Sequence, residues 1–326
     1  MGGYSYTYSI ILVGVIMMSC LLGGSEGKVR VGFYNTSCPN AETIVRGIVQ
    51  QAAISDQNNL PSLLRLHFHD CFVHGCDASI LIDRGSEADE KRAFGHQGVR
   101  GFDVVETAKA QLEAVCPGVV SCSDILALAA RDAVFFSQGP WYDVETGRRD
   151  GLVSNVTLAA HMPDVADSIH KLKAMFLAKG LTAQDLVILS AAHTIGTTAC
   201  FFVNQRLYDF PANGGSDPSI NPAFLPELKS VCPKNGDVNL RLAIDRGSEK
   251  VFDKRILGNI RSGTAVLQSD AALYQDEATA RAVDSYFGLP GPSFESDFAA
   301  SMIKMGRIGV WTGSKGQIRR ICSSFN

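Results

Sequence analysis

The feature that most constrains the fold of this chain is its set of cysteines. The sequence contains nine cysteines, and Cys20 lies in an apolar run near the start, which leaves an even number downstream. An even count in an exported chain indicates disulfide bonds, although sequence alone does not give their connectivity. A zinc site would need paired Cys-X-X-Cys units, and the spacings do not supply them. The cysteines in question are Cys38, Cys71, Cys76, Cys116, Cys122, Cys200, Cys232 and Cys322.

The first 27 residues have the character of an export signal. The apolar run Ile10–Leu22 is too short to span a bilayer but suits the core of a signal peptide, and small residues follow it. The segment before the run lacks Lys and Arg, so a membrane anchor is the alternative. We predict a signal peptide over 1–27 and one secreted domain over 28–326. Asn35 and Asn155 begin Asn-X-Thr/Ser triplets and are candidate glycosylation sites.

Composition narrows the class of protein. With 326 residues, 46% of them hydrophobic and 19% charged, the chain can build a large buried core. The formal net charge of −3 gives no reason to expect nucleic acid or an anionic membrane as a partner. A protein that acts on a small neutral or mixed substrate is favoured.

Apolar residues recur mostly with the 3.6-residue period of helices, and Gly/Pro turns separate the segments. Thr182 and Asp185 form a candidate capping box at the start of one of them. Strand-like stretches are short, so we predict an all-α fold with long functional loops. The expected helices are Ala41–Ile54, Leu60–Cys71, Gly101–Val115, Cys122–Ser137, Ala166–Lys179, Ala183–Leu189, Thr197–Tyr208, Asn221–Val231, Asp276–Tyr286 and Phe294–Gly306.

The segment Ser62–Ser79, SLLRLHFHDCFVHGCDAS, contains the main candidate site. Arg65 and His69 are four residues apart on an expected helix, so they project from one face. Histidine titrates near neutrality and arginine stays charged, so the pair suits a reaction that needs a proton shuttle and a fixed positive charge. For such a pair in isolation, a buried histidine beside a surface arginine is the commoner explanation.

Oxygen donors follow Arg65 and His69 in the sequence, and they favour a functional site over the commoner explanation. Asp70, Asp77 and Ser79 offer carboxylates and a hydroxyl next to backbone carbonyls, a donor set that suits calcium. A zinc hydrolase site built on His67-X-His69 is a competing interpretation. It would need further His and Asp ligands directly afterwards, where the sequence has cysteine and phenylalanine.

Five motifs resemble those of the plant secretory haem peroxidases, often called class III. They are RLHFHDCFVHGCDASIL (65–81), VSCSDILALAARD (120–132), GRRD (147–150), DLVILSAAHTIG (185–196) and QSD (268–270). The similarity extends, in order, over residues 28–326. It implies the all-α haem peroxidase fold, with two helical halves that enclose the haem and four disulfides that staple them.

The resemblance assigns a role to each residue around the haem. His69 would be the distal base, which takes a proton from hydrogen peroxide and delivers it to the departing oxygen. Arg65 would stabilise the negative charge on that oxygen, and Phe68 would form a wall of the haem pocket. His193 would be the axial ligand of the iron, with Asp270 as acceptor for its other ring N–H. Without the motif, a single histidine after an apolar helix is more often a packed core residue.

The same resemblance implies calcium ligands, disulfide pairs and a substrate contact. The distal calcium site would use Asp70, Val73, Gly75, Asp77 and Ser79, with Glu90 linked through water, and the proximal site Thr194, Asp245, Ser248, Val251 and Asp253. The disulfides would be Cys38–Cys116, Cys71–Cys76, Cys122–Cys322 and Cys200–Cys232. The carbonyl of Pro163 would contact aromatic reductants at the haem edge.

The sequence departs from the family pattern at His96, where an asparagine is usual. That asparagine accepts the N–H of the distal histidine. A neutral His96 could accept the same hydrogen bond, whereas a protonated one could not, so we hypothesise an unusual loss of peroxide reactivity on the acid side. The alternative is a loop histidine that points elsewhere. Thr197 and Thr198 also stand where a basic residue near a haem propionate is common, so propionate anchoring is expected to differ.

Together these observations predict a secreted, extracellular (cell wall or apoplast) haem peroxidase that contains haem b and two calcium ions. It would reduce hydrogen peroxide and oxidise small phenolic donors in two one-electron steps, with the haem supplying the redox chemistry. We expect a monomer with no nucleic-acid or membrane partner. The alternatives are a calcium-bound extracellular wall protein of the same fold with weakened catalysis, and the zinc hydrolase.

Overall fold

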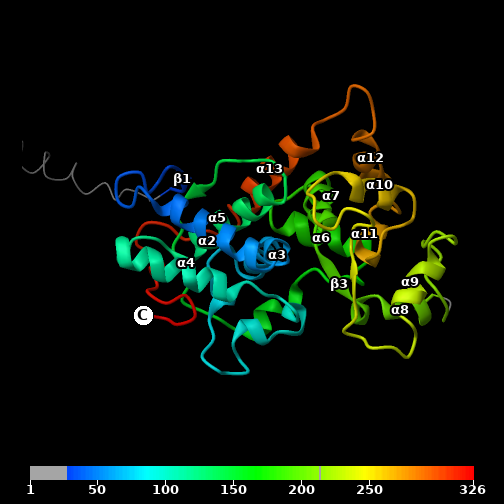
Figure 1. The fold of residues 1–326 in the computed structure, drawn as a ribbon, viewed down its shortest axis with the longest axis horizontal. Helices are drawn as coiled ribbons and strands as arrows, with labels where there is room; N and C mark the ends of the chain where they lie inside the picture. Colours follow the sequence, from blue (N-terminus) through cyan, green and yellow to red (C-terminus); the bar gives the residue numbers. More distant parts are fainter. Residues whose placement is uncertain (1–27, 213) are drawn as a thin grey trace, which may run out of the picture.

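Helices dominate the computed structural model, which describes residues 28–212 and 214–326 (Figure 1). The predicted signal peptide, 1–27, lies outside the described residues. The α-helices are α2 (Ala41–Ser55), α3 (Asn59–Val73), α4 (Phe102–Val115), α5 (Cys122–Phe136), α6 (Ile169–Ala178), α7 (Ala183–Ser190), α8 (Asn204–Tyr208), α9 (Leu225–Val231), α10 (Arg255–Arg261), α11 (Gln268–Ala272), α12 (Glu277–Ser285) and α13 (Phe294–Met305). The predicted helical class is confirmed.

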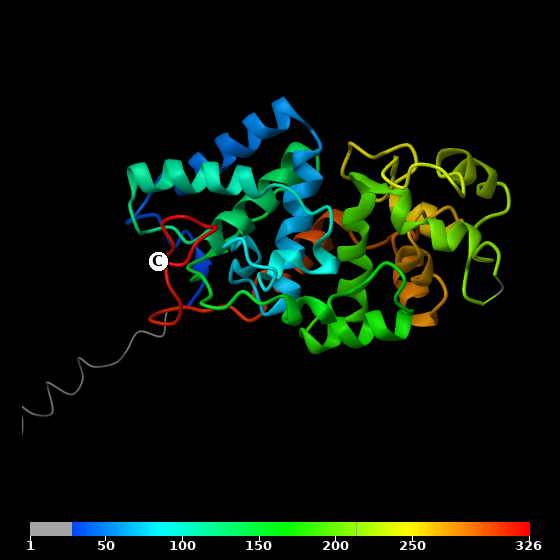
Figure 2. The same cartoon turned by 90° about the horizontal axis from the view of Figure 1, so that it is seen from below.

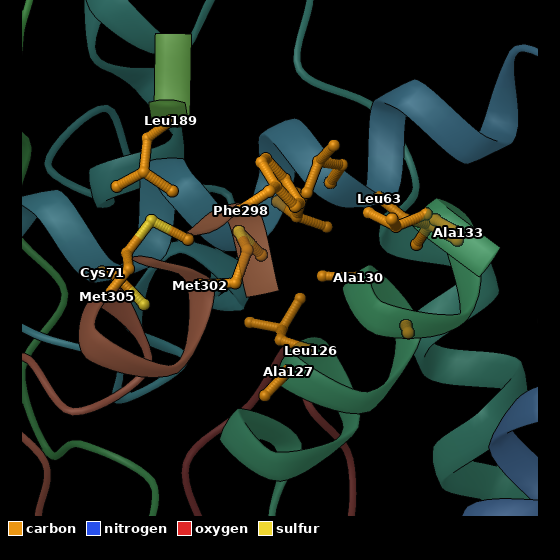
Figure 3. Close-up of a cluster of buried hydrophobic side chains, with 14 of the residues drawn as sticks. Leu63, Cys71, Leu126, Ala127, Ala130, Ala133, Leu189, Phe298, Met302 and Met305 are labelled. Atoms are coloured by element: carbon orange, nitrogen blue, oxygen red, sulfur yellow. The ribbon is translucent and has the colours of Figure 1, made fainter. Parts of the chain in front are cut away.

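The helices form two groups that lie side by side. Figures 1 and 2 show α2 to α5 in one group and α6 to α12 in the other, with α13 between them. One hydrophobic core runs through both groups. Figure 3 shows where they meet: Leu63 of α3 and Leu126 of α5 lie in the same cluster as Leu189 of α7 and Phe298 of α13. Each group therefore buries its apolar stripe partly against the other, which fixes α3 relative to α7.

The start of α7 is fixed by its cap. The Thr182 side chain accepts from the backbone N–H of Asp185, and Asp185 accepts in return from the backbone N–H of Thr182, so the predicted capping box is present. The Asp185 carboxylate also accepts from Lys304 Nζ at 2.8 Å and from Ser301 Oγ at 2.8 Å, both on α13. The cap thereby docks α7 on α13 and sets the position of His193, which follows α7 directly.

Strands are few and short in the part of the chain that the structure describes. β1 (Arg30–Val31) pairs antiparallel with β2 (Glu145–Thr146), and β3 (Thr197–Ala199) pairs antiparallel with β4 (Arg241–Ala243). The helix expected over Thr197–Tyr208 is therefore wrong at its first half. The β-branched Thr197 and Thr198 pair with Ala243 and Leu242, and such residues favour a strand where a partner strand is present.

Four disulfides staple the described chain, with the pairing that the family resemblance implies. The Cα–Cα distances are 5.8 Å for Cys38–Cys116, 4.0 Å for Cys71–Cys76, 5.7 Å for Cys122–Cys322 and 5.4 Å for Cys200–Cys232. Cys122–Cys322 closes a loop of 200 residues and joins the last segment of the chain to the start of α5. Long loops of this kind remove the most entropy from the unfolded chain.

The C-terminal segment is built into the first helical group. Arg319 is fully buried, and its guanidinium donates to the backbone carbonyls of Ala78 and Cys322 at 2.8 and 2.9 Å. It also donates to the carbonyls of Asp77 and Gly151 at 3.3 Å. Residues near the end of the chain thus hold the loop that follows α3.

Within the described residues, no single helix has the length and apolar character needed to cross a membrane. The pair Ile169–Ala178 and Ala183–Thr194 meets these criteria only when taken together, and it is bent by 107°.

Candidate active site

The distal pair lies on one face of α3. Arg65 Nε donates to His69 Nε2 at 3.0 Å, and Arg65 Nη2 donates to the backbone carbonyl of Gln97 at 3.2 Å. His69 is 6% exposed, so its imidazole is nearly closed off from bulk water. The i, i+4 spacing of the sequence thus brings the two side chains into direct contact, as predicted from helix geometry.

Burial and neighbouring charge set the protonation of this pair. Burial, and after it the charge of Arg65, holds the pKa of His69 well below its usual range. The imidazole is therefore neutral at physiological pH and available as a base. Burial and the charge of Arg241 lower the pKa of Arg65 to about 10, which still leaves the guanidinium charged near neutrality.

His96 lies directly behind His69. The two Nδ1 atoms are 2.8 Å apart, and His96 is 4% exposed. His96 Nε2 lies 3.7 Å from Glu90 Oε1, and both side chains are buried. Hydrogen-bond logic assigns the protons: Arg65 can only donate, so His69 Nε2 accepts, His69 Nδ1 carries the proton and His96 Nδ1 accepts it. The remaining proton of a neutral His96 then faces the carboxylate of Glu90.

The loop after α3 gathers buried oxygen atoms that have no hydrogen-bond donor. Asp70 Oδ1, Ser79 Oγ and both carboxylate oxygens of Glu90 are buried without a hydrogen-bond partner among the described residues. Burial and the charges of Asp77 and Glu90 raise the pKa of Asp70 well above its usual range. Buried carboxylates this close together repel one another unless a cation binds between them. The donor set consequently fits a calcium ion.

The two backbone carbonyls expected at this site, those of Val73 and Gly75, each accept a hydrogen bond from a different part of the chain. The carbonyl of Gly75 accepts from the N–H of Asp77 at 2.9 Å, inside the loop. The carbonyl of Val73 accepts from Lys179 Nζ at 2.9 Å. A carbonyl oxygen has two lone pairs, so this bond leaves one for another partner. Lys179, on the far side of the junction between the helical groups, is a neighbour of the loop that the sequence did not indicate.

On the proximal side, His193 and Asp270 are paired across 77 residues of sequence. His193 Nδ1 lies 2.9 and 3.1 Å from the two Asp270 oxygens. Burial lowers the pKa of His193, but the charge and hydrogen bond of Asp270 outweigh this effect, so the net pKa is raised. The side chain nevertheless remains 38% accessible, so the ring faces an opening, and Nε2 carries no hydrogen bond to a described residue. This donor set fits a histidine that would bind haem iron, with a carboxylate behind the ring.

The five residues predicted for the proximal calcium site converge next to His193. Thr194 Oγ1 lies 2.8 Å from Asp245 Oδ2, 3.5 Å from the Val251 carbonyl and 3.4 Å from Asp253 Oδ1. Ser248 Oγ lies 2.8 Å from Asp253 Oδ2. Burial and the charge of Asp253 raise the pKa of Asp245 to about 6. These hydroxyl, carbonyl and carboxylate oxygens also form a donor set that suits calcium.

The geometry gives no support to a zinc site at His67. His67, Cys71 and Cys76 lie close together, but both sulfurs belong to one disulfide and are not free thiolates. Burial and the charge of Arg148 lower the pKa of His67 to about 3. His67 is a buried neutral residue of the core, and His69 is engaged by Arg65 and His96.

The remaining predicted residues lie near the surface or the pocket wall. Phe68 packs edge-on against His69, with ring centroids 5.6 Å apart. Pro163 is half-buried after the 3-10 segment Val156–His161. Asn35 is exposed, whereas the Asn155 side chain is half-buried and accepts from the N–H of Thr157, the third residue of its triplet.

Comparison with known proteins agrees with this geometry. A family model described as Peroxidase matches residues 45–288, and the chain belongs to that family. It is 62% identical to Peroxidase 43 of Arabidopsis thaliana over 314 residues, which are 95% of this chain and 96% of the relative. It is 54% identical to Peroxidase 13 of Arabidopsis thaliana over 94% of this chain and 95% of the relative. It is 48% identical to Peroxidase N1 of Nicotiana tabacum over 98% and 96%.

The class implied by the sequence motifs is therefore confirmed: the protein is a class III haem peroxidase, an oxidoreductase that uses hydrogen peroxide to oxidise donor molecules. The wall protein with weakened catalysis is not favoured, since the relatives are named as peroxidases and cover nearly the whole chain.

Proposed function

We propose that Arg65 and His69 form the distal catalytic pair of this peroxidase and that His193 binds the haem iron, with Asp270 as the partner that orients it. The observation that carries the proposal is the hydrogen bond from Arg65 to His69 Nε2, with His96 behind the ring. These contacts leave His69 neutral, with the proton on Nδ1 and the basic nitrogen toward Arg65.

The residues divide the peroxide reaction between them. The haem, when bound, supplies the iron and the redox equivalents. His69 Nε2 takes the proton from one oxygen of hydrogen peroxide and delivers it to the other oxygen, which leaves as water. Arg65 stabilises the negative charge that develops on the departing oxygen, and a preorganised donor of this kind is typically worth about 3 kcal/mol. Asp270 accepts the Nδ1–H of His193, which makes that ring a more basic ligand.

The two oxygen clusters bind calcium in this proposal. The distal ion is held by Asp70, Asp77 and Ser79, with carbonyls of Val73 and Gly75 and with Glu90 through water. The proximal ion is held by Thr194, Asp245, Ser248, Val251 and Asp253. Asp70 follows His69 and Thr194 follows His193, so each ion would hold the backbone beside one catalytic histidine.

The donors are small phenols, which approach an open haem edge where the carbonyl of Pro163 is a contact. The proposal also includes cleavage of the signal peptide after residue 27 and export of the protein, as a monomer, to the cell wall or apoplast. Asn35 and Asn155 would carry glycans. The disulfides found in the described chain support export, because such bonds persist in oxidising compartments.

The test is a visible spectrum of the purified protein with added peroxide, followed by a panel of phenols. We expect a Soret band and rapid phenol oxidation. Arg65→Leu is expected to slow peroxide consumption about 100-fold when the two proteins are compared at equal haem content, because one charge-stabilising donor is lost. A haem-bound protein that does not oxidise any phenol would instead support the wall protein.

A further inference from the structure

Arg65 and Arg241 are two cations near the haem site with no acidic partner. Neither guanidinium forms an ion pair with a carboxylate anywhere in residues 28–212 and 214–326. Arg241 Nε donates to Thr197 Oγ1 at 2.7 Å, and its Nη2 donates to the Thr197 carbonyl at 2.6 Å. These two bonds leave Nη1 of Arg241 without a hydrogen-bond partner among those residues.

The strand pairing determines where Arg241 is held. Arg241 pairs with Ala199 across the β3–β4 ladder, and its side chain runs back along β3 to Thr197. Thr197 comes four residues after His193, the ligand proposed for the iron. The clamp therefore fixes a guanidinium on the segment that leads away from the proximal histidine.

The distal helix approaches the same segment. A Cβ added to Gly196 would lie 2.8 Å from Cβ of Pro61, so β3 begins in contact with the first turn of α3. Pro61 and Arg65 are four residues apart and share a face of α3. Arg65 is thus brought toward the same junction from the distal side. In agreement with this placement, the charge of Arg241 contributes to the lowered pKa of Arg65.

Arg65 is half-buried and Arg241 is exposed, and no described carboxylate pairs with either guanidinium, so an anionic group at this junction would be attracted by both charges. Haem has two propionate carboxylates, which are its charged groups at neutral pH. Arg65 lies four residues before His69, the histidine proposed for one face of the haem. Thr197, which holds Arg241, lies four residues after His193, the histidine proposed for the other face. An edge of the haem that reaches this junction would place a carboxylate within reach of both.

We infer that Arg241, clamped by Thr197 across β3 and β4, is a binding residue for a haem propionate, with Arg65 contributing charge from the distal side. The residue supplies from β4 a cation that neither Thr197 nor Thr198 of β3 can provide. A guanidinium suits a carboxylate because its N–H groups match the two oxygens. The inference rests on the haem site proposed above.

The experiment measures haem release from the holoenzyme rather than turnover. Holoenzyme is mixed with an excess of apomyoglobin, and the rate of haem transfer is followed in the Soret region. Arg241→Gln is expected to release haem about tenfold faster, the size expected for one charge-assisted hydrogen bond at an exposed position. Thr197→Val keeps the charge but loses the Oγ1 bond, so a smaller acceleration is expected. Arg281→Gln, an exposed position on α12, is the matched control and should release haem at the wild-type rate.

Two comparisons identify the carboxylate. With haem dimethyl ester in place of haem, the difference between wild type and Arg241→Gln should disappear, because the propionate charge is gone. An equal difference with the ester would overturn the inference, as would unchanged release in both variants. A third overturning result is unchanged release together with a raised KM confined to phenols that carry a carboxylate, since Arg241 would then bind the donor. Failure of the haem site itself is seen separately, as a wild-type protein without a Soret band.

Discussion

Replacement of His96 by leucine tests the distal network most directly. His96 Nδ1 lies 2.8 Å from His69 Nδ1, and the two side chains are 4% and 6% exposed. Leucine is similar in size to the imidazole but cannot accept a hydrogen bond. The variant therefore leaves the Nδ1–H of His69 buried without a partner, or drives the proton to Nε2, where it blocks the base.

The expected loss follows from that unsatisfied donor. A buried polar group deprived of its partner costs roughly 1–3 kcal/mol, which corresponds to about a 5- to 150-fold decrease in kcat/KM for peroxide. Water cannot easily replace the lost acceptor at a site this closed. His96→Asn retains an acceptor, so its rate at neutral pH should lie within about threefold of the wild type.

The assay is peroxide consumption at low peroxide and saturating phenol, followed from pH 4 to pH 8 at equal haem content. Protonated imidazole has no acceptor, whereas an amide does not titrate in this range. The wild type should therefore lose activity on the acid side, and His96→Asn should keep it. Titration of His69 itself is not expected to limit the rate there, because burial, and after it the charge of Arg65, keeps the pKa of His69 well below its usual range.

Two results would refute the reasoning. If His96→Leu consumes peroxide within twofold of the wild-type rate, the short contact in the structure has no role in orienting His69. If His96→Asn and the wild type share one pH profile, protonation of His96 does not control the acid side. Loss of haem in either variant would be visible in the Soret band and is corrected for by the equal loading.

Three further predictions concern the calcium sites, the contact between His193 and Asp270, and the contact between α7 and α13. Chelation of calcium should lower both peroxidase activity and Tm, because the buried oxygens around Asp70 would repel one another without a cation; an unchanged Tm after verified metal removal would contradict the assignment. Asp270→Asn should raise the reduction potential of the iron, since the ring of His193 loses a charged acceptor; redox titration would show no shift if the contact were incidental. Burial opposes ionisation of Asp185, but hydrogen bonds from Lys304 and from the cap outweigh it and lower the pKa, so its stabilising effect is present above the unfolded pKa of about 4 and is lost as pH falls through the folded value. Asp185→Asn should accordingly reduce the free energy of unfolding at pH 7 more than at pH 3, as measured by urea denaturation.

Much of the site could be predicted because its information is local. The spacing of Arg65 and His69 fixes their common face once the helix is assigned, and short motifs carry His193 and Asp270. The place of His96 was a hypothesis from one departure in a motif, and the structure brings it against His69. These are cases where a few neighbouring residues determine the geometry.

Other features depend on partners that are distant in sequence. Arg241 and Thr197 are 44 residues apart, and no periodicity links them, so the role of Arg241 could not be read from the chain. The same strand pairing made the helix expected over Thr197–Tyr208 wrong, because the β-branched Thr197 and Thr198 form a strand once β4 lies beside them. Lys179 reaches the carbonyl of Val73 across 106 residues, which again required the tertiary fold.

The burial of Arg319 has a consequence for biosynthesis. This residue is separated by 241 positions from Ala78, whose carbonyl it binds, and Cys322 must reach Cys122 across 200 residues. A ribosome therefore finishes the loop after α3 long before it delivers the guanidinium that holds it. During translation the first helical group therefore lacks the Arg319 hydrogen bonds and the Cys122–Cys322 disulfide until these late residues have been made.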